Sequence, residues 1–175
     1  MLFRSPARRF VVQRHRARRL HYDFRLEIHG VLVSWAVPRG PTLDSAARRL
    51  AIRVGDHDLA HFDFEGVVAN ATYGKGDVIV WDWGTWSPGE DEDPTGAIRD
   101  GELHLDLVGE KLAGRFVLIR TGRATAPPAV ATSREQWLLL HKRDEHAVAG
   151  WDAEQHPRSV KSGMTNDELP RPSRP

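Results

Sequence analysis

The sequence predicts a mainly β protein, a compact single-domain β-barrel with short helical segments. Many short runs alternate apolar and polar residues or are rich in β-branched residues, and few segments have helical period. Turn signals containing Gly or Pro separate these runs. The 175 residues are 40% hydrophobic, which suffices for one sizeable core. Frequent short strands with turns between them are typical of a barrel or sandwich.

Eight strands are expected in chain order, each bounded by a turn signal: Phe10–Gln13, His21–Ile28, Val31–Val37, Leu50–Val54, Val78–Trp83, Glu102–Leu107, Arg115–Arg120 and Gln136–His141. A short helix is expected over Ser45–Arg49, because the Asp44 side chain can accept the free amides of a first helical turn. Residues 88–96 and 123–133 are expected to be loops. We place the barrel domain at 10–160, between a flexible N-terminal segment, 1–9, and a flexible tail, 161–175.

Charge is balanced overall and uneven along the chain. The 25 Lys and Arg nearly cancel the 24 Asp and Glu, so net charge does not indicate nucleic acid. The N-terminal third, however, carries a cluster of arginines: Arg4, Arg8, Arg9, Arg14, Arg16, Arg18 and Arg19. The run Arg14–Arg19 can follow a nucleic-acid backbone, or it can be a solvated charged loop.

The chain contains no cysteine, so it has neither a disulfide framework nor a thiolate metal site. No stretch resembles a signal peptide, and no apolar run has the length to span a bilayer. The sequence therefore favours a cytoplasmic protein without a membrane partner.

The most informative segment is the expected strand His21–Ile28. Alternation places His21, Asp23 and Arg25 on one face and large apolar residues on the other. His15 lies six residues earlier, an even offset that would keep it on the same face of an unbroken strand, although the arginines between them interrupt the pattern. Two imidazoles and a carboxylate form a common open ligand set for a divalent transition metal. The alternative is a group of satisfied polar residues at a strand edge.

Two further features could serve phosphate chemistry. Beside a metal, the planar fork of Arg25 can grip a phosphate bidentately; alone, it more often forms a salt bridge to a neighbouring acid such as Asp23. His57 and His61 form a second cluster after the fourth strand, where an imidazole can contact phosphate or protonate a leaving oxygen. Surface histidines flanked by acids are the simpler interpretation of this cluster.

Taken together, a series of motifs resembles the 3′-phosphoesterase domain of bacterial DNA ligase D, in the order and approximate spacing of that family. The motifs span nearly the whole chain: Phe10–His15, Arg18–Glu27, Ser34–Pro41, Asp56-His57, Phe64–Gly66, Tyr73-Gly74, Val80–Asp82, Gly84–Trp86, Trp137–Leu140, Asp144-Glu145 and Arg158–Val160.

The resemblance implies a compact β-barrel with a manganese-dependent activity that trims DNA 3′ ends during end joining. Such enzymes remove a terminal ribonucleoside to leave a 3′-phosphate, and then hydrolyse that phosphate to a 3′-hydroxyl. The matching positions imply three metal ligands, His15, His21 and Asp23. They imply three catalytic groups, Arg25, His57 and His61. They also imply four substrate-binding or supporting groups: Gln13, Arg14, Arg39 and Arg49. Water is the expected nucleophile.

Manganese is the expected metal, although the same donor set also accepts zinc, cobalt or copper. The expected partners are DNA or RNA-tipped DNA 3′ ends, with ligase, polymerase or Ku end-joining proteins as companions. Two rival interpretations remain: a noncatalytic barrel that binds nucleic-acid ends, and another metal-assisted hydrolase acting on a small phosphoester.

The chain also departs from the family pattern at three places. His61 stands where the family usually has Tyr, Gly55 stands where an acidic residue commonly precedes the Asp-His pair, and residues 68–72 replace an Ile-Pro-x-Gly-x run. The first two positions touch the expected site. We therefore expect metal binding to persist while the balance between the two reaction steps changes.

Overall fold

The computed structural model describes residues 8–68, 76–89, 93–123 and 135–171. These residues form nine strands, one α-helix and three short 3₁₀-helices. In chain order they are β1 (Arg8–Arg16), β2 (Leu20–Ile28), β3 (Val31–Val37), β4 (Arg49–Asp58), η1 (Leu59–His61), β5 (Gly66–Val68), β6 (Gly76–Pro88), α1 (Pro94–Asp100), β7 (Glu102–Gly109), β8 (Ala113–Arg123), β9 (Glu135–His141), η2 (Ala153–Gln155) and η3 (Asn166–Glu168).

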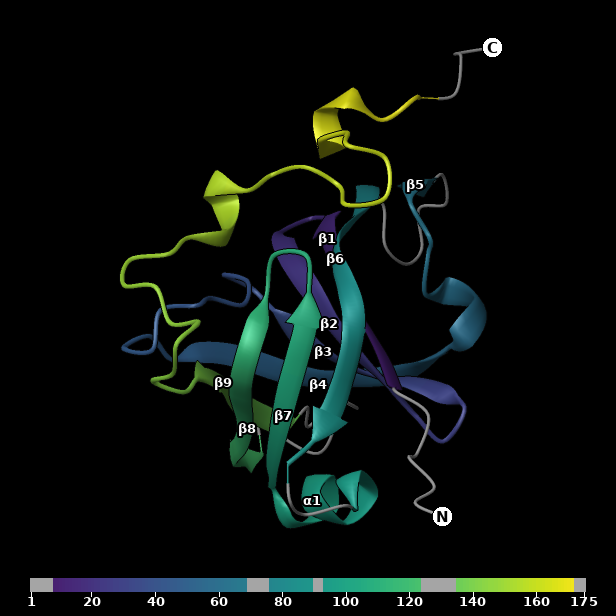
Figure 1. Cartoon of the computed structure of the whole chain (residues 1–175). Coiled ribbons are helices and arrows are strands. Elements are labelled where there is room, and N and C mark those ends of the chain that lie inside the picture. Colours follow the sequence, from purple (N-terminus) through teal and green to yellow (C-terminus); the bar gives the residue numbers. More distant parts are fainter. Residues whose placement is uncertain (1–7, 69–75, 90–92, 124–134, 172–175) are drawn as a thin grey trace, which may run out of the picture.

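The sheet closes into an eight-stranded antiparallel barrel (Figure 1). The strands follow the order β1-β2-β3-β4-β9-β8-β7-β6, and β6 returns to pair with β1. The short β5 adds to β6 outside this ring. Closure removes the free sheet edges that would otherwise expose unpaired backbone groups. The expected β-barrel with short helical segments is confirmed.

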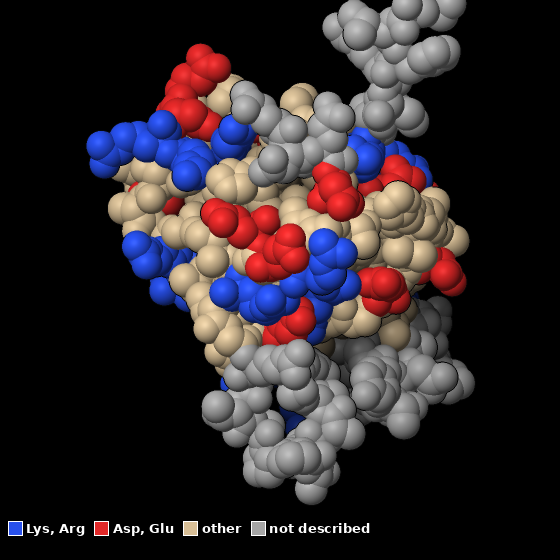
Figure 2. All heavy atoms as spheres, turned by 90° about the horizontal axis from the view of Figure 1, so that it is seen from below, with Lys and Arg blue, Asp and Glu red and all other residues tan. Residues whose placement is uncertain are grey.

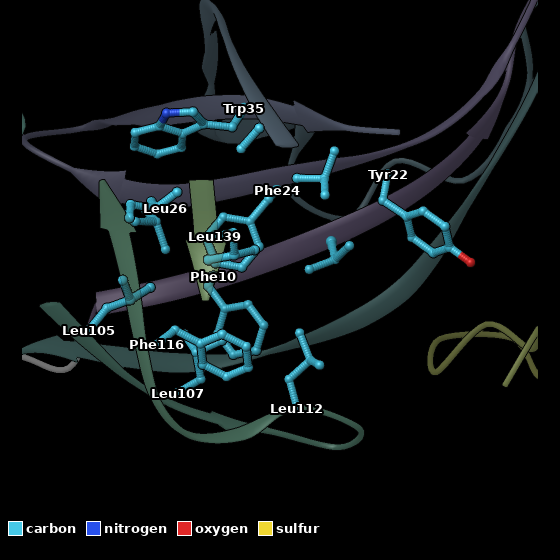
Figure 3. Close-up of a cluster of buried hydrophobic side chains, with 14 of the residues drawn as sticks. Phe10, Tyr22, Phe24, Leu26, Trp35, Leu105, Leu107, Leu112, Phe116 and Leu139 are labelled. Carbon is cyan, nitrogen blue, oxygen red and sulfur yellow. The ribbon is translucent and has the colours of Figure 1, made fainter. Parts of the chain in front are cut away.

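The barrel interior holds the hydrophobic core. Figure 3 shows Phe10, Phe24, Leu26 and Phe116 gathered between the strands, and all four are fully buried. Because side chains alternate along a strand, the apolar residues of β2 point inward and the polar ones point to the outer face. The candidate site must therefore lie on the outside of the barrel.

Helix positions differ from the expectation. Residues 45 and 46 form a turn, closed by a hydrogen bond from the Ala47 amide to the Asp44 carbonyl, rather than a helix, and β4 already begins at Arg49. The Asp44 carboxylate accepts the amides of Ala46 and of the distant Gly150, so it ties two segments together instead of starting a helix. A helix forms instead at α1, which begins inside the expected loop 88–96 and continues beyond it to Asp100, with Asp93 capping the first turn. The expected loop 123–133 lies almost wholly outside the described residues.

The C-terminal residues also differ from the expectation. The predicted tail, 161–175, is described as far as residue 171, and this part packs on the barrel, with Asn166 and Leu169 buried. Thr165 and Glu168 form a reciprocal capping box around η3. At the other end, residues 8 and 9 of the predicted segment 1–9 belong to β1, and the rest of that segment lies outside the described residues.

Charged side chains of both signs are mixed on the described part of the face drawn in Figure 2. No described helix combines the length and apolar character needed to cross a bilayer. Figure 2 shows acidic and basic side chains interspersed on the described part of the face seen from below, the end at which α1 lies in Figure 1. This face therefore does not resemble a polyanion-binding surface.

The close approach of β6 and β7 predicts that Gly84→Ala destabilises the barrel. Gly84 pairs with Gly109, and a Cβ on Gly84 would lie 1.9 Å from the carbonyl oxygen of Val108, a backbone atom that cannot move without separating the strands. We expect a loss of about 1–3 kcal/mol in the free energy of unfolding, measured by urea denaturation. Gly122→Ala is the control, because nothing lies within 4 Å of its Cβ. Equal midpoints for the two variants would contradict this account.

Candidate active site on the outer face of the barrel

The β1–β2 hairpin brings the three candidate ligands together. His15 pairs directly across the hairpin with His21, and their ring centroids are 4.8 Å apart. Asp23 lies two residues further along β2, on the same outer face. The two histidines thus share a face as the sequence predicts, but as cross-strand neighbours rather than members of one strand.

The ligand atoms of His15, His21 and Asp23 all lie within 4.8 Å of one another. The carboxylate Oδ2 of Asp23 is 3.3 Å from Nε2 of His21 and 3.7 Å from Nδ1 of His15. Nε2 of His15 is buried and has no hydrogen-bond partner among the described residues. A compact group of two imidazoles and one carboxylate, with an unsatisfied nitrogen, fits a divalent transition metal.

Protonation of this cluster is governed by the Asp23 carboxylate. Burial alone would raise the pKa of Asp23, but the two adjacent histidines and the nearby Arg25 charge hold it below its ordinary value. Burial alone would lower the pKa of His21, and the bond to Asp23 raises it above its ordinary value. Nδ1 of His21 lies 3.3 Å from the carbonyl oxygen of Arg19, so we assign it as a donor. A cation at Nε2 would therefore compete with a proton.

Arg25 lies beside the ligand cluster, and its side chain is only 4% exposed. Its Nε donates to Oε1 of Gln13 at 2.7 Å, and its Nη1 donates to Ser34 Oγ and His57 Nδ1, each at 2.9 Å. Nη2 faces Asp23 Oδ2 at 3.4 Å. The bidentate phosphate grip predicted from the sequence is thus not available while these contacts persist, because only Nη2 remains for a ligand.

Gln13 of β1 and Ser34 of β3 fix the position of the Arg25 guanidinium by accepting its hydrogen bonds. Gln13 is fully buried, and its amide nitrogen donates to the carbonyl oxygens of His61 and Phe64, at 3.0 and 3.1 Å. Gln13, predicted as a substrate-binding or supporting residue, contacts Arg25 and ties the segment after β4 over the outer face. Ser34 Oγ donates to the Leu32 carbonyl while it accepts from Arg25. Ser34 entered the sequence analysis only as the first residue of the motif Ser34–Pro41, without a role, since a serine inside an apolar strand carries no distinctive pattern.

A β-bulge aims His57 at Arg25. Ser34 of β3 pairs with Val54 of β4, whereas Leu32 pairs with His57, so one residue of β3 faces two on β4. The extra residue reverses the alternation and puts His57 on the outer face. A glycine within a strand pattern, here Gly55, is the sequence signal that could have indicated the bulge.

His57 and His61 form a neighbouring pair of rings. Their centroids are 4.9 Å apart, and the His61 ring stacks on Phe64. Burial and the Arg25 charge lower the pKa of both imidazoles, that of His61 to about 4, so both are neutral at pH 7. Because Arg25 only donates, Nδ1 of His57 must accept, although the Gly55 carbonyl also lies 3.1 Å from this nitrogen. We therefore assign the proton of His57 to Nε2.

The remaining predicted residues do not join the cluster. Arg14 lies on the opposite face of β1, where its guanidinium binds Glu154 and Asn166. Arg39 is exposed after β3, and Arg49 begins β4 with its Nε buried and unpartnered. Within the described residues, neither arginine has a hydrogen bond or ion pair to the candidate ligands or to Arg25.

Fold and site together define a β-barrel with a candidate centre of two histidines and one carboxylate, set beside a buried arginine. The profile of the DNA ligase D 3′-phosphoesterase domain matches residues 13–120, which include every ligand of the cluster as well as Arg25, His57 and His61. The chain belongs to this family.

Curated relatives agree with this assignment. The chain is 50% identical over 139 residues, 79% of its length, to the multifunctional non-homologous end joining protein LigD of Pseudomonas aeruginosa. It is 46% identical over 112 residues (64% of the chain) to the corresponding DNA repair protein of Mycobacterium tuberculosis, and 43% identical over 119 residues (65%) to that of Mycolicibacterium smegmatis. The matched regions span only 16, 14 and 15% of these relatives, respectively.

The lowered pKa of His61 predicts a pH-dependent stability. Between the ordinary value of 6.5 and the folded value of about 4, the unfolded chain binds more protons at this position than the folded chain. The free energy of unfolding should therefore fall as the pH falls through this window. His61→Phe, which keeps a ring against Phe64, should flatten the slope measured by urea denaturation between pH 4 and 7. His29→Asn, at an exposed histidine, is the control and should leave the slope of the free energy of unfolding against pH unchanged. Equal slopes for both variants would contradict the assignment of this pH dependence to His61.

Proposed function

We propose that this chain is a metal-dependent DNA 3′-end-processing phosphoesterase of end-joining repair, which removes a 3′-terminal ribonucleoside and hydrolyses a 3′-phosphate. The observation that carries the proposal is the outer face of the hairpin, where His15, His21 and Asp23 converge beside Nη2 of Arg25. A metal next to a guanidinium is a common means of neutralising a reacting phosphoryl group. Family membership and the end-joining names of the relatives support the same proposal.

In this proposal, His15, His21 and Asp23 hold the cation. Manganese is the proposed metal, and zinc, cobalt and copper suit the same donors. When bound, the metal supplies a Lewis acid that offsets negative charge on a phosphate oxygen.

The protein's own groups position the phosphate. Arg25 provides a fixed positive charge through Nη2, because Gln13 and Ser34 restrain the other two nitrogens. Neutral His57 donates from Nε2 to a phosphate oxygen, which suits its lowered pKa better than protonation of a leaving group would. Water supplies the nucleophile.

The proposed substrates are DNA and RNA-tipped DNA 3′ ends, and ligase, polymerase and Ku are the proposed companions of the full pathway. A noncatalytic end-binding barrel is less consistent with the site. Backbone binding requires exposed Lys and Arg side chains, whereas here Arg25 and Asp23 are buried and grouped with two histidines.

The proposal predicts that His21→Ala abolishes processing of a labelled primer-template that ends in one ribonucleotide or in a 3′-phosphate. Loss of a ligand removes charge stabilisation, so we expect the rate in manganese to fall by about 100-fold or more in a gel assay. His104→Ala is the matched control, because that histidine pairs with Glu102 on β7. Tight end binding without reaction by the unchanged protein would instead support the noncatalytic barrel, and preference for a generic small phosphoester would support the third interpretation.

The two departures at the site predict an altered balance between the two steps. We expect the protein to accumulate the 3′-phosphate product, because a neutral imidazole at 61 differs from a phenol in charge and reach, and Gly55 supplies no carboxylate. His61→Tyr and Gly55→Glu should each raise the phosphomonoesterase rate relative to ribonucleoside removal, measured as separate single-turnover rates. Nothing lies within 4 Å of a Cβ at Gly55, so the new side chain has space. An unchanged ratio of the two rates in both variants would refute this expectation.

A further inference from the structure

The C-terminal segment, residues 142–171, follows β9 and passes along one side of the barrel toward one end. Figure 1 shows its last part beside the ends of β1 and β6. Only part of the chain, residues 13–120, matches the family profile, so this segment lies beyond the match. Its contacts with β1 and β2 fall on Arg14, Arg16 and Tyr22, each of which is adjacent in the chain to a candidate metal ligand.

On β1, the residues on either side of His15 are both held. Arg14 forms a two-point ion pair with Glu154, at 2.9 and 2.7 Å, and donates to Asn166 Oδ1 at 2.7 Å. Arg16 forms a two-point ion pair with Asp77 of β6, at 2.8 and 2.7 Å, and another pair with Asp167. Both guanidinium groups of this part of the basic run are therefore committed to protein carboxylates, so they do not form a free phosphate-binding surface.

Asn166 connects these contacts at the backbone. Its side chain is almost fully buried, and its amide nitrogen lies within hydrogen-bond distance of the carbonyl oxygens of Arg14 and Asp77, at 3.1 and 3.2 Å, and of Asp77 Oδ1 at 2.9 Å. A buried amide with these partners fixes its surroundings, because breaking any one contact leaves an unsatisfied polar group. The carbonyl of Arg14 belongs to the peptide bond that leads into His15.

On β2, the same segment reaches the residue between the other two ligands. The hydroxyl of Tyr22 donates to Glu154, which also binds Arg14. Figure 3 shows the Tyr22 ring extending away from the core cluster, with its hydroxyl at the outer end. Tyr22 lies directly between His21 and Asp23 in the chain.

Because side chains alternate between the two faces of a strand, contacts on the inner face also restrain the orientation of the ligands on the outer face. His15, His21 and Asp23 project from the outer face, whereas Arg14, Arg16 and Tyr22 project from the opposite face of the same two strands. A rotation of either strand moves the side chains of both faces together. Without partners for its inner face, the end of a hairpin is a region that opens locally at low free-energy cost.

We propose that three residues of the C-terminal segment, Glu154, Asn166 and Asp167, form a clamp together with Asp77 of β6. This clamp positions the metal ligands of the β1–β2 hairpin from the opposite face. These four are positioning residues, because none of them contacts the candidate metal ligands. The inference rests on the metal-binding part of the proposed function and extends it to a segment beyond residues 13–120, the part of the chain that the family profile matches.

The first test measures Mn²⁺ affinity by isothermal titration calorimetry in the full chain and in Asn166→Ala. We expect the dissociation constant to rise about tenfold, the low end of the effect seen when groups that orient metal ligands are removed. Lys111→Met is the matched control. Lys111 donates to the carbonyl oxygens of His156 and Arg158 in the same segment, and among the described residues no hydrogen bond or ion pair joins its side chain to β1 or β2. The control should keep its affinity for Mn²⁺.

A second, more conservative substitution tests the clamp in case Asn166→Ala disturbs folding. Glu154→Gln keeps the size of the side chain, weakens its ion pair with Arg14 and leaves one acceptor oxygen in place of two for Arg14 and Tyr22. A rise of about twofold to threefold in the dissociation constant is expected. Circular dichroism and urea midpoints of each variant report whether the barrel remains folded. Equal loss of affinity in Asn166→Ala and Lys111→Met would identify the segment as a general stabiliser and overturn the proposal.

The second test is amide hydrogen exchange in the metal-free protein, which does not depend on activity or on a bound ion. Asn166→Ala should accelerate exchange in the hairpin residues 13–23 while the amides of β7 and β8 keep their protection. Unchanged hairpin exchange would overturn the clamp. Absence of Mn²⁺ binding by the unchanged protein would count against the proposed function instead, and the exchange result would still decide whether the clamp exists.

Discussion

Arg25 carries a permanent charge at a position that is almost fully buried, and four consecutive strands supply the groups that satisfy it. Gln13 of β1, Asp23 of β2, Ser34 of β3 and His57 of β4 all contact its guanidinium. Removal of any one partner would leave a buried charge or donor unsatisfied. The outer face of the barrel therefore depends on this guanidinium, both for its order and for the way its polar groups converge.

The same interaction sets the electrostatics of the site. Arg25 helps to keep Asp23 ionised and His57 and His61 neutral, as the directions of their pKa shifts indicate. The face thus combines an anionic ligand, neutral imidazoles and one guanidinium nitrogen directed at the cluster. That combination suits a divalent cation and a phosphate together better than either ligand alone. The clamp proposed for the opposite face would preserve this arrangement by restraining the hairpin.

Much of the site could be predicted because strand periodicity is local. The pattern of β2 was sufficient to place His21, Asp23 and Arg25 on one face, and the structure brings His15 to them across a hairpin. Other features depend on contacts between distant residues. The bulge that turns His57 outward requires a register between β3 and β4, and the burial of Asn166 requires β1 and β6. No local pattern distinguishes a tail of this composition from a flexible one.

Local patterns in the chain are enough for the mainly β class, the strand order and the polar face of the hairpin, because alternation and turn residues act over a few positions. Long-range contacts are needed to show that the site lies outside the barrel, that Gln13 supports Arg25, and that Arg14 binds Glu154 and Asn166 from the opposite face of β1. The reason is that barrel closure assigns an inside and an outside to each strand. The partner of a charged side chain is then chosen from segments far apart in the chain, here more than 100 residues away for Arg14.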